Sequence, residues 1–206
     1  MERPFVPMRL ARVKHVRPLL VFILVTACSS SRHASPPANS TSNTSTPASA
    51  TRACSSSDLN LAIDPAGVSE ATGQNTIVFR LANRASSPCR LYGYPTVRLL
   101  ATNGQALRFK FATRGDMMLT SAKPAPIKLA PNASAFGAVN KFRCDVGEKA
   151  RATQIGVLPP GEARRLSTGL PAYPVIGYCG PGDPGSMVDI APMVAALPEL
   201  LRSVAG

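Results

Sequence analysis

Four cysteines constrain the fold of this chain more than any other feature of its sequence. They are Cys54, Cys89, Cys144 and Cys179, and they follow an N-terminal segment that has the pattern of a secretory signal. An even number of cysteines in a secreted domain is typical of disulfides, so we expect two. Four cysteines allow three pairings. We favour Cys54–Cys89 with Cys144–Cys179, because each pair then closes a loop of similar length around neighbouring strands.

The first 27 residues have the organisation of a bacterial secretory signal. Their apolar run, from Leu19 to Ala27, is about half of the ~20 residues that cross a bilayer, which argues against a permanent anchor helix. The segment before the run is basic and contains a single acid, Glu2. Its bases are Arg3, Arg9, Arg12, Lys14 and Arg17. A basic head followed by a short apolar middle predicts a signal peptide at residues 1–27.

The end of the signal predicts how the protein is held at the membrane. The sequence Val25-Thr26-Ala27-Cys28 resembles a lipobox, in which the cysteine is acylated, with palmitate for example, and becomes the mature N-terminus. Two acyl chains at Cys28 give stable anchoring. We therefore expect a lipoprotein of the cell membrane, on its extracytoplasmic face. The alternative is an ordinary signal peptide whose cleavage site adjoins a cysteine, which releases a secreted protein.

Residues 28–53 are expected to form a disordered tether. After Cys28 the segment consists almost entirely of Ser, Thr, Ala, Pro and Asn and has no large apolar side chain. Such a composition has nothing to bury and does not fold by itself. The tether is expected to hold the following domain, residues 54–206, clear of the lipid head groups.

The hydrophobic pattern of residues 54–206 predicts an all-β domain. The run TIVFRLAN (76–83) places Ile77, Phe79 and Leu81 on one face and Arg80 on the other, and LRFKFAT (107–113) alternates in the same way. This pattern indicates a sheet with one solvated face. Short runs separated by Pro and Gly favour a β-sandwich. Further candidate strands are TVRLL (96–100), PIKLA (126–130), ASAFGAV (133–139), TQIGVL (153–158) and SMVDIA (186–191), and the tail from 191 is expected to hold a short helix interrupted at Pro198.

The segment NRASSPCRLYGYPTVRLL (83–100) resembles a segment of actinobacterial lipoproteins and secreted proteins that runs from an asparagine through serine and cysteine to L-x-G-Y-P. The family is known as domain of unknown function 4232. IKLAPNASAFGAV (127–139) and YCGPGD…MVDIAPM (178–193) resemble its later segments, with Asn132 where a glycine is common in a turn. Asn also accepts a left-handed backbone, so this departure is tolerated. The resemblance implies an immunoglobulin-like antiparallel sandwich with two disulfides, and it implies no activity.

The residue types that most enzymes require are missing from the predicted domain. Its sequence contains no histidine, because the two in the chain are His15 and His33, and bridged cysteines leave no thiolate nucleophile or soft metal ligand. It has neither a P-loop nor a dinucleotide-binding glycine pattern. We therefore expect no enzyme activity, no catalytic residue, no metal and no cofactor. A remote alternative is a hydrolase with two carboxylates, such as Asp145 with Glu148 or Asp183 with Asp189.

Binding is the remaining expectation, and two surfaces are candidates. An exposed aromatic patch around Tyr92, Tyr94 and Tyr173 would suit an adaptor that contacts another envelope protein. A basic face that includes Arg108 and Lys110 would instead bind lipid or an anionic wall polymer, in keeping with the formal net charge of +12 of the chain. Nucleic acid is not an expected partner, because the location is wrong and no recognition motif accompanies the charge.

Overall fold

The computed structural model of the chain describes residues 51–201, and the predicted signal peptide and Cys28 lie outside them. Short strands dominate the described part. They are β1 (Leu59–Ile63), β2 (Ser69–Ala71), β3 (Gln74–Asn83), β4 (Cys89–Leu91), β5 (Thr96–Leu100), β6 (Lys110–Ala112), β7 (Ile127–Leu129), β8 (Ser134–Phe142), β9 (Ala150–Ala152), β10 (Gln154–Leu158), β11 (Leu166–Gly169), β12 (Ile176–Tyr178) and β13 (Met187–Ile190). The short helical elements are η1 (Pro65–Gly67), η2 (Pro184–Ser186) and α1 (Leu197–Leu200).

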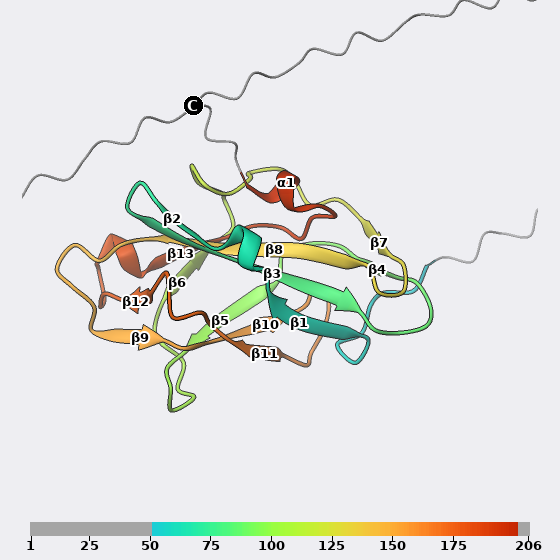
Figure 1. Ribbon diagram of the computed structural model, residues 1–206, viewed down its shortest axis with the longest axis horizontal. Coiled ribbons are helices and arrows are strands. Elements are labelled where there is room, and N and C mark those ends of the chain that lie inside the picture. The colour runs from blue at the N-terminus through green and yellow to red at the C-terminus, as the bar shows by residue number, and fades with distance from the viewer. Residues whose placement is uncertain (1–50, 202–206) are drawn as a thin grey trace, which may run out of the picture. The chain divides into compact units, whose positions relative to one another are not determined.

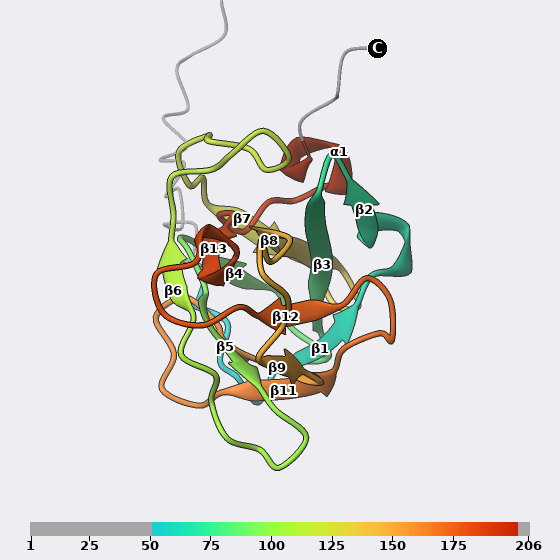
Figure 2. The ribbon, with the colours of Figure 1, turned by 90° about the vertical axis from the view of Figure 1, so that its left-hand side faces the viewer.

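The strands form an immunoglobulin-like β-sandwich, which confirms the predicted all-β fold. The larger sheet has the order β1-β3-β8-β13-β6, with β2 paired to β3, and the smaller sheet has the order β11-β10-β5. Figures 1 and 2 show the two sheets as separate layers, with β3 and β8 in one and β5 and β11 in the other. The pairs are antiparallel except for β13 with β6, which run parallel. Two-stranded ladders, β12-β9 and β4-β7, complete the described sheets.

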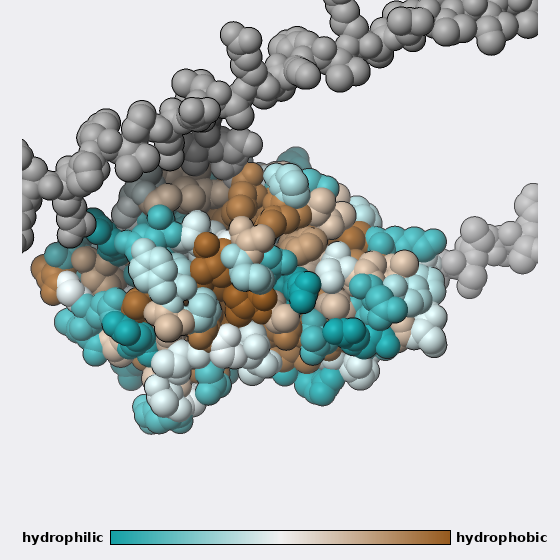
Figure 3. Space-filling model, viewed as in Figure 1, coloured by the Kyte–Doolittle hydropathy of each residue, from teal (hydrophilic) through white to brown (hydrophobic). Residues whose placement is uncertain are grey.

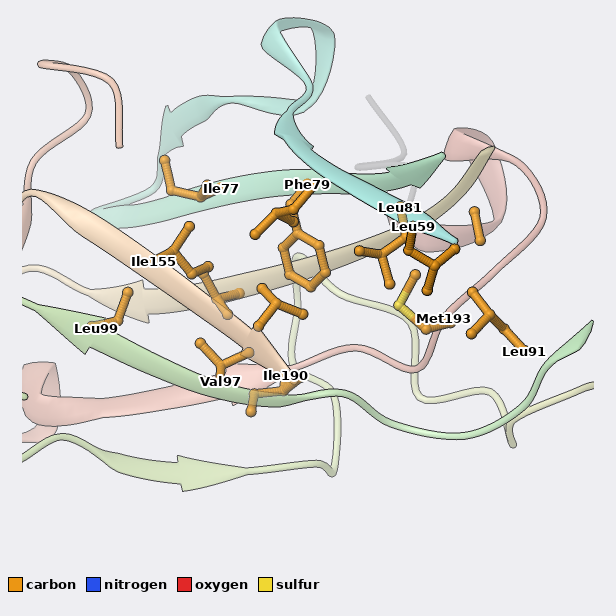
Figure 4. Close-up of a cluster of buried hydrophobic side chains, with 14 of the residues drawn as sticks. Leu59, Ile77, Phe79, Leu81, Leu91, Val97, Leu99, Ile155, Ile190 and Met193 are labelled. Carbon is orange, nitrogen blue, oxygen red and sulfur yellow. The ribbon is translucent and has the colours of Figure 1, made fainter. Parts of the chain in front are cut away.

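The main core lies between the two sheets, where the sequence pattern places it. Ile77, Phe79 and Leu81 of β3 are fully buried, and they face side chains from β5 and β10 such as Val97 and Ile155. The Phe79 ring points into the space between the layers in Figure 4. Each of these side chains has its hydrophobic surface removed from water, which is the main stabilising contribution in such a domain.

The outer face of β3 and β8 is not solvated throughout, in contrast to the prediction of one wet face. Arg80 is exposed as expected, but Val78 is fully buried beside Ala138. A second hydrophobic cluster covers both residues with side chains from the loop after β6 and from the C-terminal segment, including Leu119 and Leu200. The loop and the tail are also joined by a hydrogen bond from the Thr120 amide to the Leu200 carbonyl. Residues distant in sequence bury this face, so the local pattern could not reveal it.

The run LRFKFAT (107–113) does not form the single alternating strand that the sequence predicts. The Leu107 amide donates to the Leu99 carbonyl in the smaller sheet, whereas Lys110 begins β6, which pairs with β13 of the larger sheet. The chain therefore crosses from one sheet to the other within this run, as strands at sandwich corners do. Phe109 stays buried, but Phe111 is 38% exposed and the prediction that it points inward is wrong.

Both predicted disulfides are present. Cys54 is bonded to Cys89 and Cys144 to Cys179, each across a sequence separation of 35 residues. The first bridge ties the N-terminal edge of the domain to β4, and the second ties the segment after β8 to the end of β12. The pairing favoured from loop length is thereby confirmed.

The two ends of the described domain differ in detail from the prediction. Arg52 and Ala53, which the composition assigns to the tether, pair with Arg90, so the folded part begins before Cys54. At the other end Pro198 does not interrupt the helix but occupies the first turn of α1. Proline is tolerated there because the amides of the first turn lack intrahelical partners in any case.

Candidate functional site

Arg108 and Lys110, two of the predicted binding residues, line one hollow on the surface of the domain. Arg108 lies two residues before Lys110, and both are exposed whereas Phe109 between them is buried. Lys110 is paired with Met187 at the edge of the larger sheet. We call the hollow the basic hollow. It is lined by Arg108, Lys110, Tyr178, Gly180, Pro181, Gly182, Asp183, Pro184, Ser186 and Met187, and its volume is about 210 Å³.

A hydrogen-bonded turn, residues 180–186, contributes much of the remaining lining of the hollow. The Asp183 carboxylate accepts a hydrogen bond of 2.8 Å from the Gly185 amide and so caps η2. The Cys179 amide donates to the Ser186 hydroxyl at 3.1 Å, which closes the turn at its base. Gly185 is packed so tightly that a Cβ there would lie 2.5 Å from the Arg143 carbonyl oxygen and 2.6 Å from the Cys179 sulfur. The hollow is therefore preformed.

Two further cations lie at the margin of the basic hollow. The Arg114 guanidinium is 3.2 Å from the Met187 sulfur, which lines the hollow. The Lys149 side chain lies over Gly180, where an added Cβ would be 2.8 Å from its Nζ atom. Asp183 is the acid in the lining, and it is engaged by the backbone of its own turn. Arg114 also lies 3.5 Å from the Asp189 carboxylate, so Arg108, Lys110 and Lys149 are the cations around the hollow without such a partner among the residues described above, and an excess of cations suits an anionic group.

The geometry of the basic hollow permits binding of a small anion. A hollow of about 210 Å³ has room for a phosphate-sized group, since a water molecule occupies roughly 30 Å³ of liquid. Arg and Lys both recognise phosphate, Arg with a bidentate fork and Lys as a point charge. The Tyr178 ring, which lines the hollow, packs edge-on against Phe109 with centroids 5.3 Å apart. These groups can hold and orient a ligand, and nothing in the lining is a nucleophile paired with a base.

The predicted tyrosines are not gathered with the two cations. Tyr173 is 66% exposed and lines a different, apolar groove. On its other side it lines a hollow that contains Glu70, and a hydrogen bond to Glu70 raises the pKa of Tyr173. Tyr92 is 59% exposed and Tyr94 is half-buried, both between β4 and β5. The predicted binding surface therefore falls into three separate places.

The carboxylates proposed as alternative catalytic pairs have local partners. Glu148 is 3.4 Å from the Arg151 guanidinium, Asp183 caps η2, and Asp145 is exposed. Asp189 is buried in β13, with its Oδ1 atom 3.5 Å from the Arg114 Nε atom. Within residues 51–201, no cluster of three or more His, Cys, Asp or Glu side chains has a geometry that could hold a metal ion.

A buried polar row on the outer face of the larger sheet escaped the sequence analysis. Thr76, Asn140 and Asp189 lie side by side across β3, β8 and β13. The Thr76 hydroxyl donates to the Asn140 side-chain oxygen at 2.8 Å, and the Asn140 amide donates to Asp116 at 2.6 Å. Asp116 also accepts hydrogen bonds from the Met118 and Leu119 amides. The row therefore pins the loop after β6 onto the sheet, and the polar run Gln74-Asn75-Thr76 at the start of β3 was its signal in the sequence.

Asp189→Asn is expected to raise the melting temperature at pH 8 by about 2–4 °C. Burial of the carboxyl, and next the charge of Asp116, raise the pKa of Asp189 above its ordinary value. The folded state thus binds the Asp189 proton more tightly than the unfolded state. The protonated carboxyl therefore favours folding at low pH, and this stability is lost as the pH rises through the pKa of Asp189 in the folded state. Above that pKa the buried carboxylate is charged and unfavourable, and asparagine removes this charge. Thermal melts from pH 4 to 8 should show the gain shrinking as the pH falls. The exposed Asp145→Asn should show no such trend, and an equal gain at all pH values would contradict the assignment.

Comparisons with known proteins identify a family but no characterised relative. The family model described as Domain of unknown function (DUF4232) matches residues 54–180. The matched range includes both disulfides, Arg108 and Lys110, and it ends before the strand β13 that the resemblance included. No curated protein and no solved structure matches the chain. Among the described residues, no helix is long and apolar enough to cross a membrane.

Proposed function

We propose that this chain, which belongs to the family described as Domain of unknown function (DUF4232), is an envelope lipoprotein whose basic hollow binds a phosphate-bearing anion. The anchor at Cys28 and the extracytoplasmic location rest on the lipobox pattern and on the two disulfides, which are typical of oxidising compartments. The domain acts by binding and not by catalysis. The ligand chemistry is shared by phospholipid head groups and by phosphate-containing wall polymers.

One observation carries the binding proposal: Arg108 and Lys110 line the same preformed hollow, with Arg114 and Lys149 at its margin. The bland alternative is that these bases are merely the solvated side of their strands. The hydrogen-bonded turn that lines the same hollow distinguishes this place from bases such as Arg80 and Lys128, which stand exposed on β3 and β7. Preorganised walls lower the entropic cost of binding.

Arg108→Gln with Lys110→Gln is expected to weaken anion binding by about tenfold or more, because a cation beside an anionic surface contributes on the order of 1 kcal/mol. The full chain in detergent is titrated calorimetrically with poly(glycerol phosphate), with monomeric short-chain phosphatidylglycerol, and with polyglutamate. The matched control, Arg80→Gln with Lys128→Gln, removes the same charge elsewhere and should keep the affinity.

Comparing the three ligands shows whether the bound phosphate belongs to a wall polymer or to a lipid head group. Binding of the polymer but not of the lipid monomer assigns a wall polymer, and the converse assigns a lipid head group. Equal binding of polyglutamate, or an equal loss in the two double variants, would mean that affinity follows overall charge, and the hollow would not be the site.

An apolar groove beside Tyr173 supports the adaptor as a second candidate function. It is lined by Ile63, Pro65, Val68, Pro171, Tyr173 and Pro174, on the face where Figure 3 shows apolar residues gathered around η1. Exposed apolar surface next to an exposed tyrosine is typical of protein contacts. Contact with another envelope protein becomes the leading proposal if none of the anions binds.

A further inference from the structure

The two disulfides differ in their exposure to solvent. Cys54, Cys89 and Cys179 are buried, each 1% exposed or less, whereas Cys144 is half-buried. Two hollows meet at Cys144, with volumes of about 260 and 450 Å³, and Arg143 lines both of them. The Cys144 end of its bridge can therefore be reached from solvent, whereas both ends of the Cys54–Cys89 bridge lie in the main core.

A buried lysine lies at the other end of the accessible bridge. The Lys141 Nζ atom is 3.9 Å from the Cys179 sulfur, and the residue is 3% exposed. An ammonium group beside a sulfur stabilises the thiolate, and a more stable thiolate is the better leaving group in exchange. Burial also lowers the pKa of the Lys141 amine, which makes it a readier proton donor to that sulfur.

From this arrangement we propose that Cys144–Cys179 is a site of thiol–disulfide exchange with a dithiol, and that Cys144 is the sulfur attacked. A thiolate of the dithiol attacks the Cys144 sulfur, the Cys144–Cys179 bond breaks, and its electron pair remains on the Cys179 sulfur beside Lys141. The second thiolate of the dithiol then displaces the Cys144 sulfur. The dithiol is oxidised to a disulfide, and the two cysteines are reduced to thiols that carry its two protons.

Opening this bridge has a local structural consequence. Cys179 directly precedes the turn at residues 180–186, its amide donates to Ser186, and its sulfur packs against Gly185. Reduction therefore releases the base of that turn while the Cys54–Cys89 bridge still holds β4 to the N-terminal edge. Faster hydrogen exchange is expected at residues 179–186 and not at residues 89–91.

Partial reduction of the full chain under native conditions tests the site. The protein in detergent is treated with limiting dithiothreitol, quenched by alkylation and analysed by peptide mass spectrometry. We expect labelling at Cys144 and Cys179 at least about tenfold faster than at Cys54 and Cys89. A brief pulse of glutathione, a monothiol, should leave its mixed disulfide on Cys144. Equal rates for the two bridges, or a mixed disulfide on Cys179, would overturn the proposal.

Lys141→Met tests the contribution of the ammonium, because it keeps the apolar stem and removes the charge. Reduction of Cys144–Cys179 should slow by about threefold to tenfold, while the Cys54–Cys89 rate serves as the internal check that the variant is folded. The matched control is Lys123→Met, on an exposed lysine in the loop between β6 and β7, and it should keep the original rate. Equal rates in the two variants would refute a leaving-group role for Lys141.

Discussion

Phe79→Ala is expected to lower the free energy of unfolding by about 3–5 kcal/mol, the usual cost of removing a buried phenylalanine. Phe79 is fully buried, and its ring lies between the two sheets (Figure 4). Its cross-strand partner in β8 is Gly137, where a Cβ would lie 2.6 Å from the ring. The ring therefore fills the space that the glycine leaves.

Thermal and denaturant unfolding of the non-reduced full chain measure this loss. A change of 4 kcal/mol corresponds to a fall of about 8–16 °C in melting temperature for a domain of this size. Phe142→Ala is the matched control, because Phe142 is 47% exposed at the end of β8 and should change stability by less than about 1 kcal/mol. Similar losses for the two variants would mean that the Phe79–Gly137 contact does not organise the core.

The parts of the fold that follow from local chemistry could be predicted from the sequence. Strand β3 follows from the alternation of Ile77, Phe79 and Leu81, and Asn132 adopts the left-handed backbone expected at its turn, with φ of 64°. The disulfide pairing followed from loop length and is present. In each case the determining residues are neighbours in sequence or are joined by a covalent bond.

The parts that depend on distant contacts could not be predicted. Val78 is buried because the loop after β6 and the C-terminal segment cover the outer face of β3. Phe111 is exposed because the chain changes sheets between Leu107 and Lys110. At the candidate site, Arg108 and Lys110 could be chosen for their alternation, but the turn that completes the hollow is about 70 residues away in sequence.

Asn83→Ala is expected to lower the free energy of unfolding by about 3 kcal/mol, because the Asn83 side chain is a fully buried hydrogen-bonding group. Asn83 is 0% exposed, and its Nδ2 atom lies 3.0 to 3.3 Å from the carbonyls of Ser87, Leu129 and Ala130. Its Oδ1 atom accepts a hydrogen bond from the Ala85 amide. Each buried polar group that loses its partner costs about 1–3 kcal/mol, and alanine would leave several unpaired.

This side chain joins two of the three segments that carry the family resemblance, because Ala85 and Ser87 precede β4, Leu129 ends β7 and Ala130 follows it. We therefore assign Asn83, the asparagine of the first segment, a role in the stability of the fold and not a contact with a ligand. Asn83→Asp should be at least as damaging as alanine, since a carboxylate cannot donate to the Leu129 and Ala130 carbonyls. The exposed Asn60→Ala in β1 is the matched control and should stay within about 0.5 kcal/mol of the original protein in denaturant unfolding. If Asn83→Ala melts normally but loses anion binding, the first segment belongs to the ligand site after all, and the hollow at Arg108 and Lys110 is not the whole of it.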